Sequence, residues 1–384
     1  MRGRILFVAS THSHILNFHR PYLAEFRRLG YGVDAACGGR EMEIAEADAV
    51  YPISFEKSIT SPRNIVALRE LRQLLLDNHY DLISCHTSLA SFFVRLAASG
   101  LKKRPKIACI SHGYLFDQQS SVPKRLLLSS AEKMTAPVTD LLMVMNHWDK
   151  VYAETHKLGK QVVWIPGMGV NFHRFTPLPI QQGQTLREKL GFDSHHFLFI
   201  YAAEFSKRKS QAHLIEALAK TPEHIVLLLP GEGVLKQSCM ELAQQLGVSH
   251  RVVFPGHVDM PVWYAASNAA ISSSRSEGLP FNIMEAMYCG LPVIASQVKG
   301  HEDLITHQKT GLLFPYGDYN RCAALMCELE QDATLCQFLG ENAHQVSESL
   351  SLEVVFPQVM AQYGALVPLG EPSQISAEFD KSMV

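Results

Sequence analysis

The chain reads SSRSEGLPFNIMEAM at residues 273–287, between two short apolar runs, 269–271 and 293–295, that suit buried strands. Pro280 suits the first turn of a helix, because its missing N–H is not needed there. The Gly-Leu-Pro sequence at 290–292 then ends that helix before the next strand begins. The stretch therefore predicts a strand, a loop, a helix and a second strand, the repeating pattern of a parallel α/β sheet.

Two carboxylates lie at this strand-to-helix turn. Glu277 falls in the loop and Glu285 on the helix, with seven residues between them. Backbone N–H groups around Gly278 and Leu279, together with the positive end of the helix dipole, can hold a diphosphate. A carboxylate can accept hydrogen bonds from sugar or ribose hydroxyls, so the pattern indicates a nucleotide-sugar site. The simpler alternative is that Glu277 favours the helix dipole and Glu285 is a solvated helix residue.

Predicted strands and helices alternate along the chain in two sets. The first set has strands at 5–9, 32–36, 82–85, 107–111 and 141–145, with helices at 19–29, 65–78 and 88–98. The second set has strands at 197–202, 225–229, 252–254, 269–272 and 293–295, with helices at 211–220 and 235–246. This alternation predicts an α/β protein with two Rossmann-like domains.

The length of 384 residues suits two domains of this kind. We expect an N-terminal domain at 1–171, a linker at 172–184 where prolines and a Gln-rich run interrupt any regular pattern, and a C-terminal domain at 185–351. A helix at 352–367 is expected to pack back toward the N-terminal domain, and the polar tail at 368–384 to be disordered. Ligands of open α/β sheets bind at the carboxyl ends of strands, so we expect the site in the cleft between domains.

Charge differs between the two halves. Residues 1–170 contain 21 lysines and arginines against 15 acidic residues, a net +6, whereas the remainder contains 14 against 22, a net −8, which together give the −2 of the whole chain. A basic first half suits an acceptor at an anionic membrane, although dispersed surface charge explains it equally well. No apolar run approaches the length of a membrane span, and the first apolar run is too short for a signal peptide, so we expect a cytoplasmic protein.

The eight cysteines include no C-x-x-C pair, which argues against a zinc site or a disulfide framework. A basic, leucine-rich segment at 123–134 suits either contact with a membrane or an ordinary core-facing helix.

The stretch at 273–287 resembles the E-x7-E signature of the retaining GT-B glycosyltransferases of family 4 (glycosyl transferases group 1), and the chain resembles most their capsular and exopolysaccharide subgroup. The resemblance implies two Rossmann-like domains whose parallel sheets face one another across a cleft. It also implies that Glu277 contacts the donor sugar, that Glu285 contacts the ribose, and that the backbone at Gly278, Leu279 and Pro280 holds the donor.

The loop at 203–210 occupies the place of the family's G-R-L-x-x-x-K-G loop, where an arginine and a lysine neutralise the donor diphosphate. Lys209 matches the lysine, but Glu204 stands at the position of the arginine. A leaving diphosphate needs positive charge nearby, so we expect Lys209 to stabilise it and Lys207 or Arg208 to assist, although a solvated basic loop also explains the latter two. Residues 167–175 resemble the P-N-G-V-D-x-x-x-F segment at the domain junction, with Asn171 where aspartate is usual.

Histidines carry the remaining expectations. His112 follows a predicted strand and matches the family's strand-end histidine, which contacts the donor sugar. Ser13 and His14, in a loop at 10–19, are expected to meet acceptor or phosphate. The spacing of His12, His14 and His19 matches no standard metal site, so no metal is expected. Weaker matches place the nucleotide base at Gly231, His257 and Val258.

Together these features predict a hexosyl- or N-acetylhexosaminyltransferase of cell-surface polysaccharide biosynthesis, working with retention, without metal or cofactor. The expected donor is a UDP-sugar, and the expected acceptor is a saccharide or lipid-linked saccharide at the membrane periphery; no nucleic acid is expected as a partner. Two alternatives remain, which are a GT-B-type nucleotide-sugar epimerase and a noncatalytic subunit that binds a nucleotide sugar. Release of free UDP in the presence of an acceptor separates them from a transferase.

Overall fold

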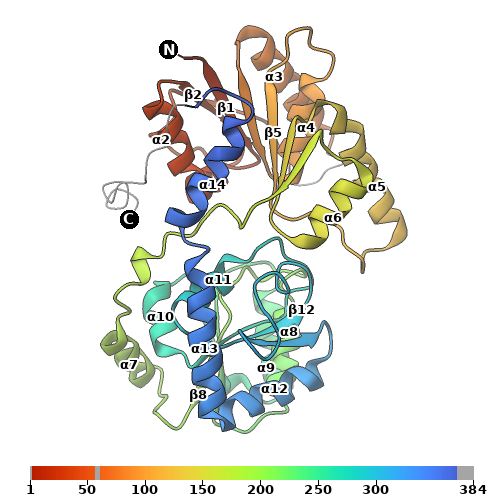
Figure 1. The fold of residues 1–384 in the computed structure, drawn as a ribbon. Coiled ribbons are helices and arrows are strands. Elements are labelled where there is room, and N and C mark those ends of the chain that lie inside the picture. The colour runs from red at the N-terminus through yellow and green to blue at the C-terminus, as the bar shows by residue number, and fades with distance from the viewer. Residues whose placement is uncertain (1, 57–60, 370–384) are drawn as a thin grey trace. The chain divides into compact units, whose positions relative to one another are not determined.

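The computed structural model describes residues 2–56 and 61–369 and divides into two compact units. Unit 1 is formed by Met1–Gly169 with Glu353–Val384, and unit 2 by Val170–Leu352. Each unit contains one parallel sheet with helices on both sides of it, as Figure 1 shows. The predicted α/β class with two parallel sheets is therefore confirmed.

The sheet of unit 1 has seven strands, and all neighbouring strands are parallel. In sheet order they are β3 (Ala49–Pro52), β2 (Gly32–Cys37), β1 (Arg4–Ala9), β4 (Leu82–His86), β5 (Lys106–Ser111), β6 (Leu141–Val144) and β7 (Gln161–Trp164). From β1 the strands follow one another toward one edge as β2 and β3, whereas β4 to β7 follow one another toward the other edge. The topological switch point therefore lies at the carboxyl ends of β1 and β4. The helices are α1 (His12–Phe18), α2 (Arg20–Arg28), α3 (Arg63–Asp77), α4 (Ser88–Ala98), α5 (Val122–Thr135), η1 (Ala136–Val138), α6 (His147–His156) and α14 (Leu352–Gly364).

The sheet of unit 2 has six parallel strands. In sheet order they are β10 (Val252–Gly256), β9 (Ile225–Pro230), β8 (Phe197–Ile200), β11 (Ala269–Ser272), β12 (Val293–Gln297) and β13 (Leu312–Pro315). The helices are η2 (His173–Phe175), α7 (Ile180–Lys189), α8 (Gln211–Leu218), α9 (Lys236–Gln245), η3 (Ser249–Arg251), α10 (Met260–Ala266), α11 (Phe281–Tyr288), α12 (Tyr319–Gln331) and α13 (Ala333–Glu348).

The core of unit 2 lies on both faces of its sheet. Along β9, Leu227 and Leu229 join one buried cluster, whereas Val226 and Leu228 join the cluster on the other face. Successive side chains of a strand point to opposite faces, so a strand buried on both sides becomes a continuous apolar run. Such runs were the strongest strand signals in the sequence, which explains why the central strands were predicted.

Three of the four edge strands, β3, β7 and β13, were not predicted, whereas the fourth, β10, was. β3 is half-buried to exposed along its whole length and β7 has no fully buried residue, so neither shows the pattern of a strand buried on both faces. β13 alternates buried with more exposed positions, and its Leu-Leu-Phe-Pro run is apolar but was missed.

Two other expectations differ from the structure. The loop predicted at 10–19 is mostly helix α1, which Thr11 caps by accepting a hydrogen bond from the His14 N–H at 3.3 Å. The irregular linker predicted at 172–184 contains η2 and the start of α7. Gly183 lies so close to Ala265 that an added Cβ would be 2.6 Å from the Ala265 carbonyl carbon. That glycine permits the close packing of α7 on α10, so its role is in packing and not in a flexible linker.

Helix α14 packs within unit 1, beside α2 in Figure 1. The ring of Phe356 lies 5.0 Å from that of Tyr22, and the ring of Tyr363 lies 5.3 Å from that of Phe26. The last described residues continue to 369, and most of the tail predicted to be disordered, at 370–384, lies outside the described residues. Among the described residues, no helix combines the length and the apolar character needed to cross a bilayer.

Candidate functional site

The segment with the two glutamates forms the connection from β11 to α11 in unit 2. Pro280 is the N-cap of α11, with φ −77° and ψ 118°, one residue before the helix begins. Glu277 lies in the loop and Glu285 in the second turn of the helix, as the sequence predicts. The helix therefore directs its N-terminal end toward the loop that carries Glu277, where an anion is favoured.

Glu277 is the centre of a buried charge cluster. Its Oε1 accepts hydrogen bonds from Lys209 Nζ at 2.6 Å and from the Ser274 hydroxyl at 2.5 Å, while its Oε2 accepts from Arg208 Nη1 at 2.6 Å. The side chain of Glu277 is 6% exposed and that of Lys209 12%, whereas Arg208 is 48% exposed. Two cations on one carboxylate leave a net positive charge on a loop that ends in a helix N-terminus.

This cluster sets the ionisation of Glu277. Burial opposes the charged form of the carboxyl, but the charges of Lys209 and Arg208 outweigh it and lower its pKa to about 2. The glutamate is therefore ionised at neutral pH and holds both cations in place. The predicted residues Glu277, Lys209 and Arg208 are thus brought together by contacts between two loops more than 60 residues apart.

Glu285 is in a different environment. Its Oε2 accepts a hydrogen bond from the Tyr264 hydroxyl at 3.0 Å. Burial raises the pKa of the Glu285 carboxyl to about 7, against the smaller opposing effects of Tyr264 and the Arg174 charge. A carboxylate with few donors around it has unused acceptor capacity, which suits a ligand that carries hydroxyl groups.

The sequence interpretation missed two residues next to the Glu277 loop, which are His301 and Gly300. His301 is fully buried and hydrogen-bonds through its ring to Ser272 at 3.1 Å and to the Ser296 backbone carbonyl at 2.8 Å. Gly300 has φ +82°, and an added Cβ would lie 2.8 Å from the Gly278 carbonyl oxygen. Only glycine permits this close approach of the two loops. In the sequence they could have been noticed as a Gly-His pair in the loop after the predicted strand at 293–295.

Three predicted base-contacting residues line one pocket of about 520 Å³ in unit 2. Gly231 has φ +136°, and an added Cβ would lie 2.2 Å from the Ala203 carbonyl oxygen, so the two strand-end loops run backbone against backbone. His257 and Val258 line the pocket from the end of β10, and Glu204 lines it with its side chain exposed. The volume is in the range of small-ligand sites.

In unit 1, the predicted histidines meet two others. His14 Nε2 lies 3.3 Å from His112 Nε2, and the rings of His19 and His86 stack with 3.6 Å between centroids. Burial lowers the pKa of His14 to about 4 and places those of the other three well below the usual value, so all four are neutral at pH 7.

The other polar residues of the α1 segment lie apart from this group. His12 Nδ1 contacts the Gly38 carbonyl at 3.0 Å, and the Ser13 hydroxyl lies 3.1 Å from that of Thr11. Spacing along α1 therefore does not define the histidine group, because the group also includes His86 at the end of β4 and His112 just beyond β5.

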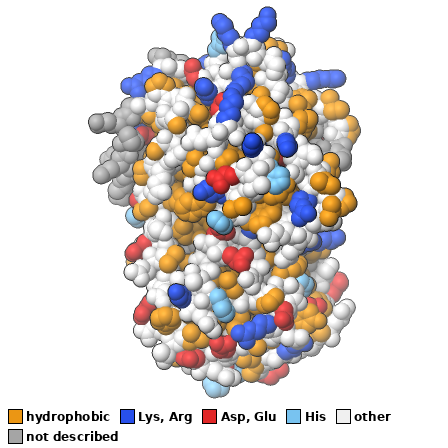
Figure 2. All heavy atoms as spheres, turned by 45° about the vertical axis from the view of Figure 1, so that its right-hand side comes forward, with side chains coloured by type: hydrophobic (Ala, Val, Ile, Leu, Met, Phe, Trp, Pro, Cys, Tyr) orange, Lys and Arg blue, Asp and Glu red, His pale blue; other side chains and the backbone are white. Residues whose placement is uncertain are grey.

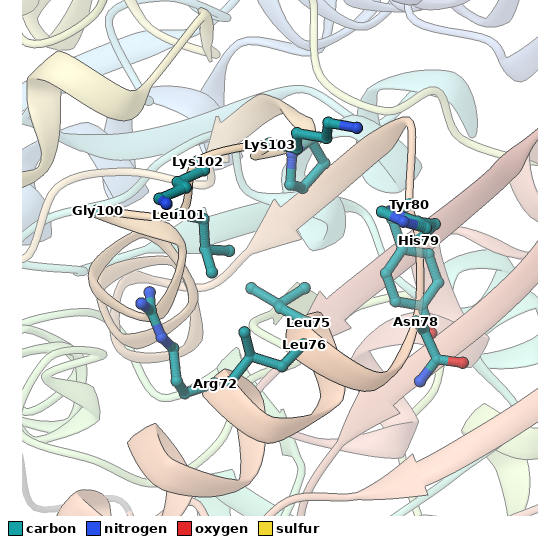
Figure 3. Close-up of a pocket in the computed structure, with 11 residues that line it drawn as sticks. Arg72, Leu75, Leu76, Asn78, His79, Tyr80, Gly100, Leu101, Lys102 and Lys103 are labelled. Atoms are coloured by element: carbon teal, nitrogen blue, oxygen red, sulfur yellow. The ribbon is translucent and has the colours of Figure 1, made fainter.

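A second pocket, of about 480 Å³, lies in unit 1 at the amino ends of the strands, opposite the carboxyl ends near the histidines (Figure 3). Its lining includes Asn78 and Tyr80, which precede β4, and Lys103, which precedes β5. These residues are at the amino ends of the strands, whereas ligands of parallel α/β sheets bind at the carboxyl ends. None of the predicted site residues lines this pocket.

Solved structures share this architecture. Anabaena Alr3699/HepE in complex with UDP matches with a TM-score of 0.77 and 19% identity, covering 94% of this chain and 100% of that one. Sucrose-phosphate synthase from Thermosynechococcus elongatus matches with a TM-score of 0.78 and 21% identity, covering 95% and 99%. The two-sheet arrangement defines the GT-B fold of glycosyltransferases.

Sequence comparison then identifies the family. Residues 182–346 match the family Glycosyl transferases group 1, and residues 4–144 match Glycosyl transferase 4-like. The putative glycosyltransferase EpsD of Bacillus subtilis is 32% identical over 354 residues, covering 90% of this chain and 92% of that protein. A UDP-Gal:α-D-GlcNAc-diphosphoundecaprenol α-1,3-galactosyltransferase of Escherichia coli is 25% identical, covering 73% and 74%. The chain belongs to the GT-B glycosyltransferases of family 4.

Proposed function

We propose that this glycosyltransferase moves a sugar from a UDP-sugar to a saccharide or lipid-linked saccharide, with retention at the anomeric carbon. The observation that carries the proposal is the cluster of Glu277 with Lys209 and Arg208 at the N-terminal end of α11, which also bears Glu285. The two positive charges of Lys209 and Arg208 and the helix dipole would together attract a donor diphosphate. Glu277 contacts the donor sugar, and Glu285 accepts hydrogen bonds from the ribose hydroxyls.

The transfer step follows from these charges. Lys209 and Arg208 stabilise the diphosphate as it leaves, at a site where burial strengthens their effect. A donor phosphate oxygen takes the proton of the acceptor hydroxyl on the same face of the sugar, so no protein carboxylate attacks the anomeric carbon. His112 contacts the donor sugar through its imidazole or its backbone carbonyl. Because Lys209 and Arg208 supply positive charge, the transfer step needs neither a metal ion at the diphosphate nor a cofactor.

The choice of donor and acceptor is supported by relatives. The name of the Escherichia coli galactosyltransferase specifies a UDP-linked donor and a diphosphoundecaprenol-linked acceptor. Anabaena HepE was crystallised with UDP and with UDP-glucose. Other similar proteins are named for exopolysaccharide or lipopolysaccharide core biosynthesis. We therefore place this chain in the synthesis of a cell-surface polysaccharide.

The donor site is tested by thermal shift against UDP-, GDP- and ADP-sugars in the presence of EDTA, with wild type and Glu285→Ala. We expect stabilisation by UDP-sugars alone, by about 2.7 kcal/mol at a concentration of 100 Kd. The shift should be lost in Glu285→Ala and kept in Glu328→Ala, an exposed glutamate of α12. Absence of any shift in the wild type contradicts the donor assignment.

Transfer itself is then tested with the selected donor and a lipid-linked saccharide acceptor. A transferase releases free UDP and extends the acceptor in equal amounts. Conversion of the donor sugar without release of UDP identifies an epimerase, and donor binding without turnover identifies a noncatalytic subunit.

Contact with a membrane surface is supported by helix α5. Leu126 is 62% exposed and Leu127 66%, and Lys124 and Lys133 are also exposed on this helix. The helix buries only Glu132 and Thr135 fully, and Leu128 packs against the core of unit 1. Figure 2 shows hydrophobic side chains among basic ones on the face that it views, with basic side chains most frequent toward its upper end. Exposed leucines beside lysines are typical of helices that lie in an anionic membrane surface.

We expect the double variant Leu126→Ser/Leu127→Ser to bind vesicles that contain phosphatidylglycerol about tenfold more weakly than the wild type, because each leucine loses its burial among lipid chains. Sedimentation of the protein with vesicles measures this change. The matched control is Leu76→Ser, which replaces a leucine that is 60% exposed on α3 of the same unit. Equal sedimentation of all three proteins contradicts membrane contact through α5.

A further inference from the structure

Four histidines converge at the topological switch point of unit 1. His14 comes from α1 after β1, His19 from the junction of α1 and α2, His86 from the end of β4, and His112 from just beyond β5. One ring nitrogen of each lies within 4.8 Å of those of the others. β1, β4 and β5 are neighbours in the sheet, so their carboxyl ends bring these side chains to one place.

The separations suit a metal ion. Four nitrogens about 2.0–2.1 Å from a tetrahedral zinc ion lie about 3.4 Å from one another. The His14 and His112 nitrogens are 3.3 Å apart. The His19 and His86 rings stack at an interplanar angle of 29°, so an ion in the plane of both requires one ring to tilt from the stack.

Two of the histidines have buried nitrogens without hydrogen-bond partners among the described residues. They are both ring nitrogens of His19 and Nδ1 of His86, and both side chains are fully buried. A buried polar atom without a partner is costly, and a bound ion would satisfy it. His14 and His112 are half-buried, so the group remains accessible from one side.

The other nitrogen of His86 is held from outside the group. His86 Nε2 lies 2.9 Å from the Ser84 hydroxyl, which lies 2.6 Å from the hydroxyl of Tyr363 on α14. Metal-binding histidines generally have their second nitrogen fixed by such a hydrogen bond, which orients the ring toward the ion. Ser84 and Tyr363 are therefore positioning residues for His86.

We propose that His14, His19, His86 and His112 bind a divalent transition-metal ion of the Zn²⁺ class. Imidazole nitrogens without thiolates suit zinc, copper, iron or nickel ions. The four histidines belong to unit 1, whereas Glu277, Lys209 and Arg208 belong to unit 2. With its ring on the ion, His112 contributes to transfer through its backbone carbonyl.

The full-length protein is stripped with a chelator, dialysed against Zn²⁺ and analysed for metal by mass spectrometry; Co²⁺, which has a visible spectrum when four-coordinate, serves as a second probe. We expect one ion per chain. The variant His19→Gln/His86→Gln should lose the ion, while His79→Gln, which replaces an exposed histidine of the same unit, should keep it. Tyr363→Phe should weaken binding about 10–100-fold without removing a ligand.

Donor binding by unit 2 serves as the control that each variant is folded. Each variant should retain the thermal shift with UDP-sugar in EDTA, which reports the donor site and does not depend on the metal. Absence of zinc in the wild type, or equal zinc in the wild type and in His19→Gln/His86→Gln, overturns the metal site while leaving the donor site to its own test.

Discussion

Replacement of Lys209 by methionine is expected to lower kcat by about 10²–10³-fold, because a group that stabilises the leaving diphosphate is removed from a site where burial strengthens its effect. The same change leaves Glu277 with Arg208 as its remaining cation, and Arg208 is 48% exposed. Loss of a partner from a buried ion pair costs about 3–5 kcal/mol, so we expect a loss near the lower limit. Initial rates with saturating donor and urea-induced unfolding measure the two effects.

A double variant separates activity from stability. In Glu277→Gln/Lys209→Met, no carboxylate remains to be buried without its lysine, so most of the lost stability should return while turnover stays low. The matched control is Lys207→Met, which removes an exposed lysine from the same loop and should change neither quantity. If Lys209→Met unfolds at the same urea concentration as the wild type, the pairing with Glu277 does not hold in solution.

The pH dependence of stability should report the same cluster. The pKa of Glu277 in the folded protein, about 2, is below the ordinary value of 4.5. Its ionised form therefore stabilises the protein above pH 4.5, and this contribution, about 3 kcal/mol, is lost as the pH falls toward 2. The loss should be absent from Glu277→Gln.

Glu285 should produce the opposite dependence. Its pKa in the folded protein, about 7, is above the ordinary 4.5. The carboxylate is therefore disfavoured by folding, so stability falls as the pH rises from 4.5 to 7 and remains lower above 7, by about 3 kcal/mol. Glu285→Gln keeps a group that can accept a hydrogen bond from Tyr264 but carries no charge. We expect it to be more stable than the wild type at pH 8 and equally stable at pH 4.

Donor binding should depend on the same proton. If the ionised Glu285 accepts from ribose hydroxyls, the affinity for UDP-glucose should rise about tenfold between pH 6 and pH 8 as the group ionises. Isothermal titration calorimetry at pH 6, 7 and 8 measures the change; the diphosphate diester of a UDP-sugar stays fully ionised over this range. Glu285→Gln should bind weakly and without pH dependence, whereas Glu328→Gln on α12 should follow the wild type.

Local sequence determined the segment on which the assignment depends. The central strands could be predicted as apolar runs, because a strand that is buried on both faces has apolar side chains at successive positions. Pro280 marked the start of α11, and this placed Glu277 in a loop and Glu285 on a helix. The edge strands β3 and β7 remained unpredicted because their residues are half-buried to exposed, and the short apolar run of β13 was also missed.

By itself, then, the sequence determined the fold class, the family resemblance and the identity of the two glutamates, because these depend on patterns within about 15 residues. Only the tertiary structure decided that Lys209 and Arg208 both hold Glu277 and lower its pKa, whereas burial raises the pKa of Glu285. It also decided that His86 completes a group with His14, His19 and His112. Charges and ring nitrogens interact through space, so residues far apart in the chain acquire their chemistry only when the strands of a sheet bring them together.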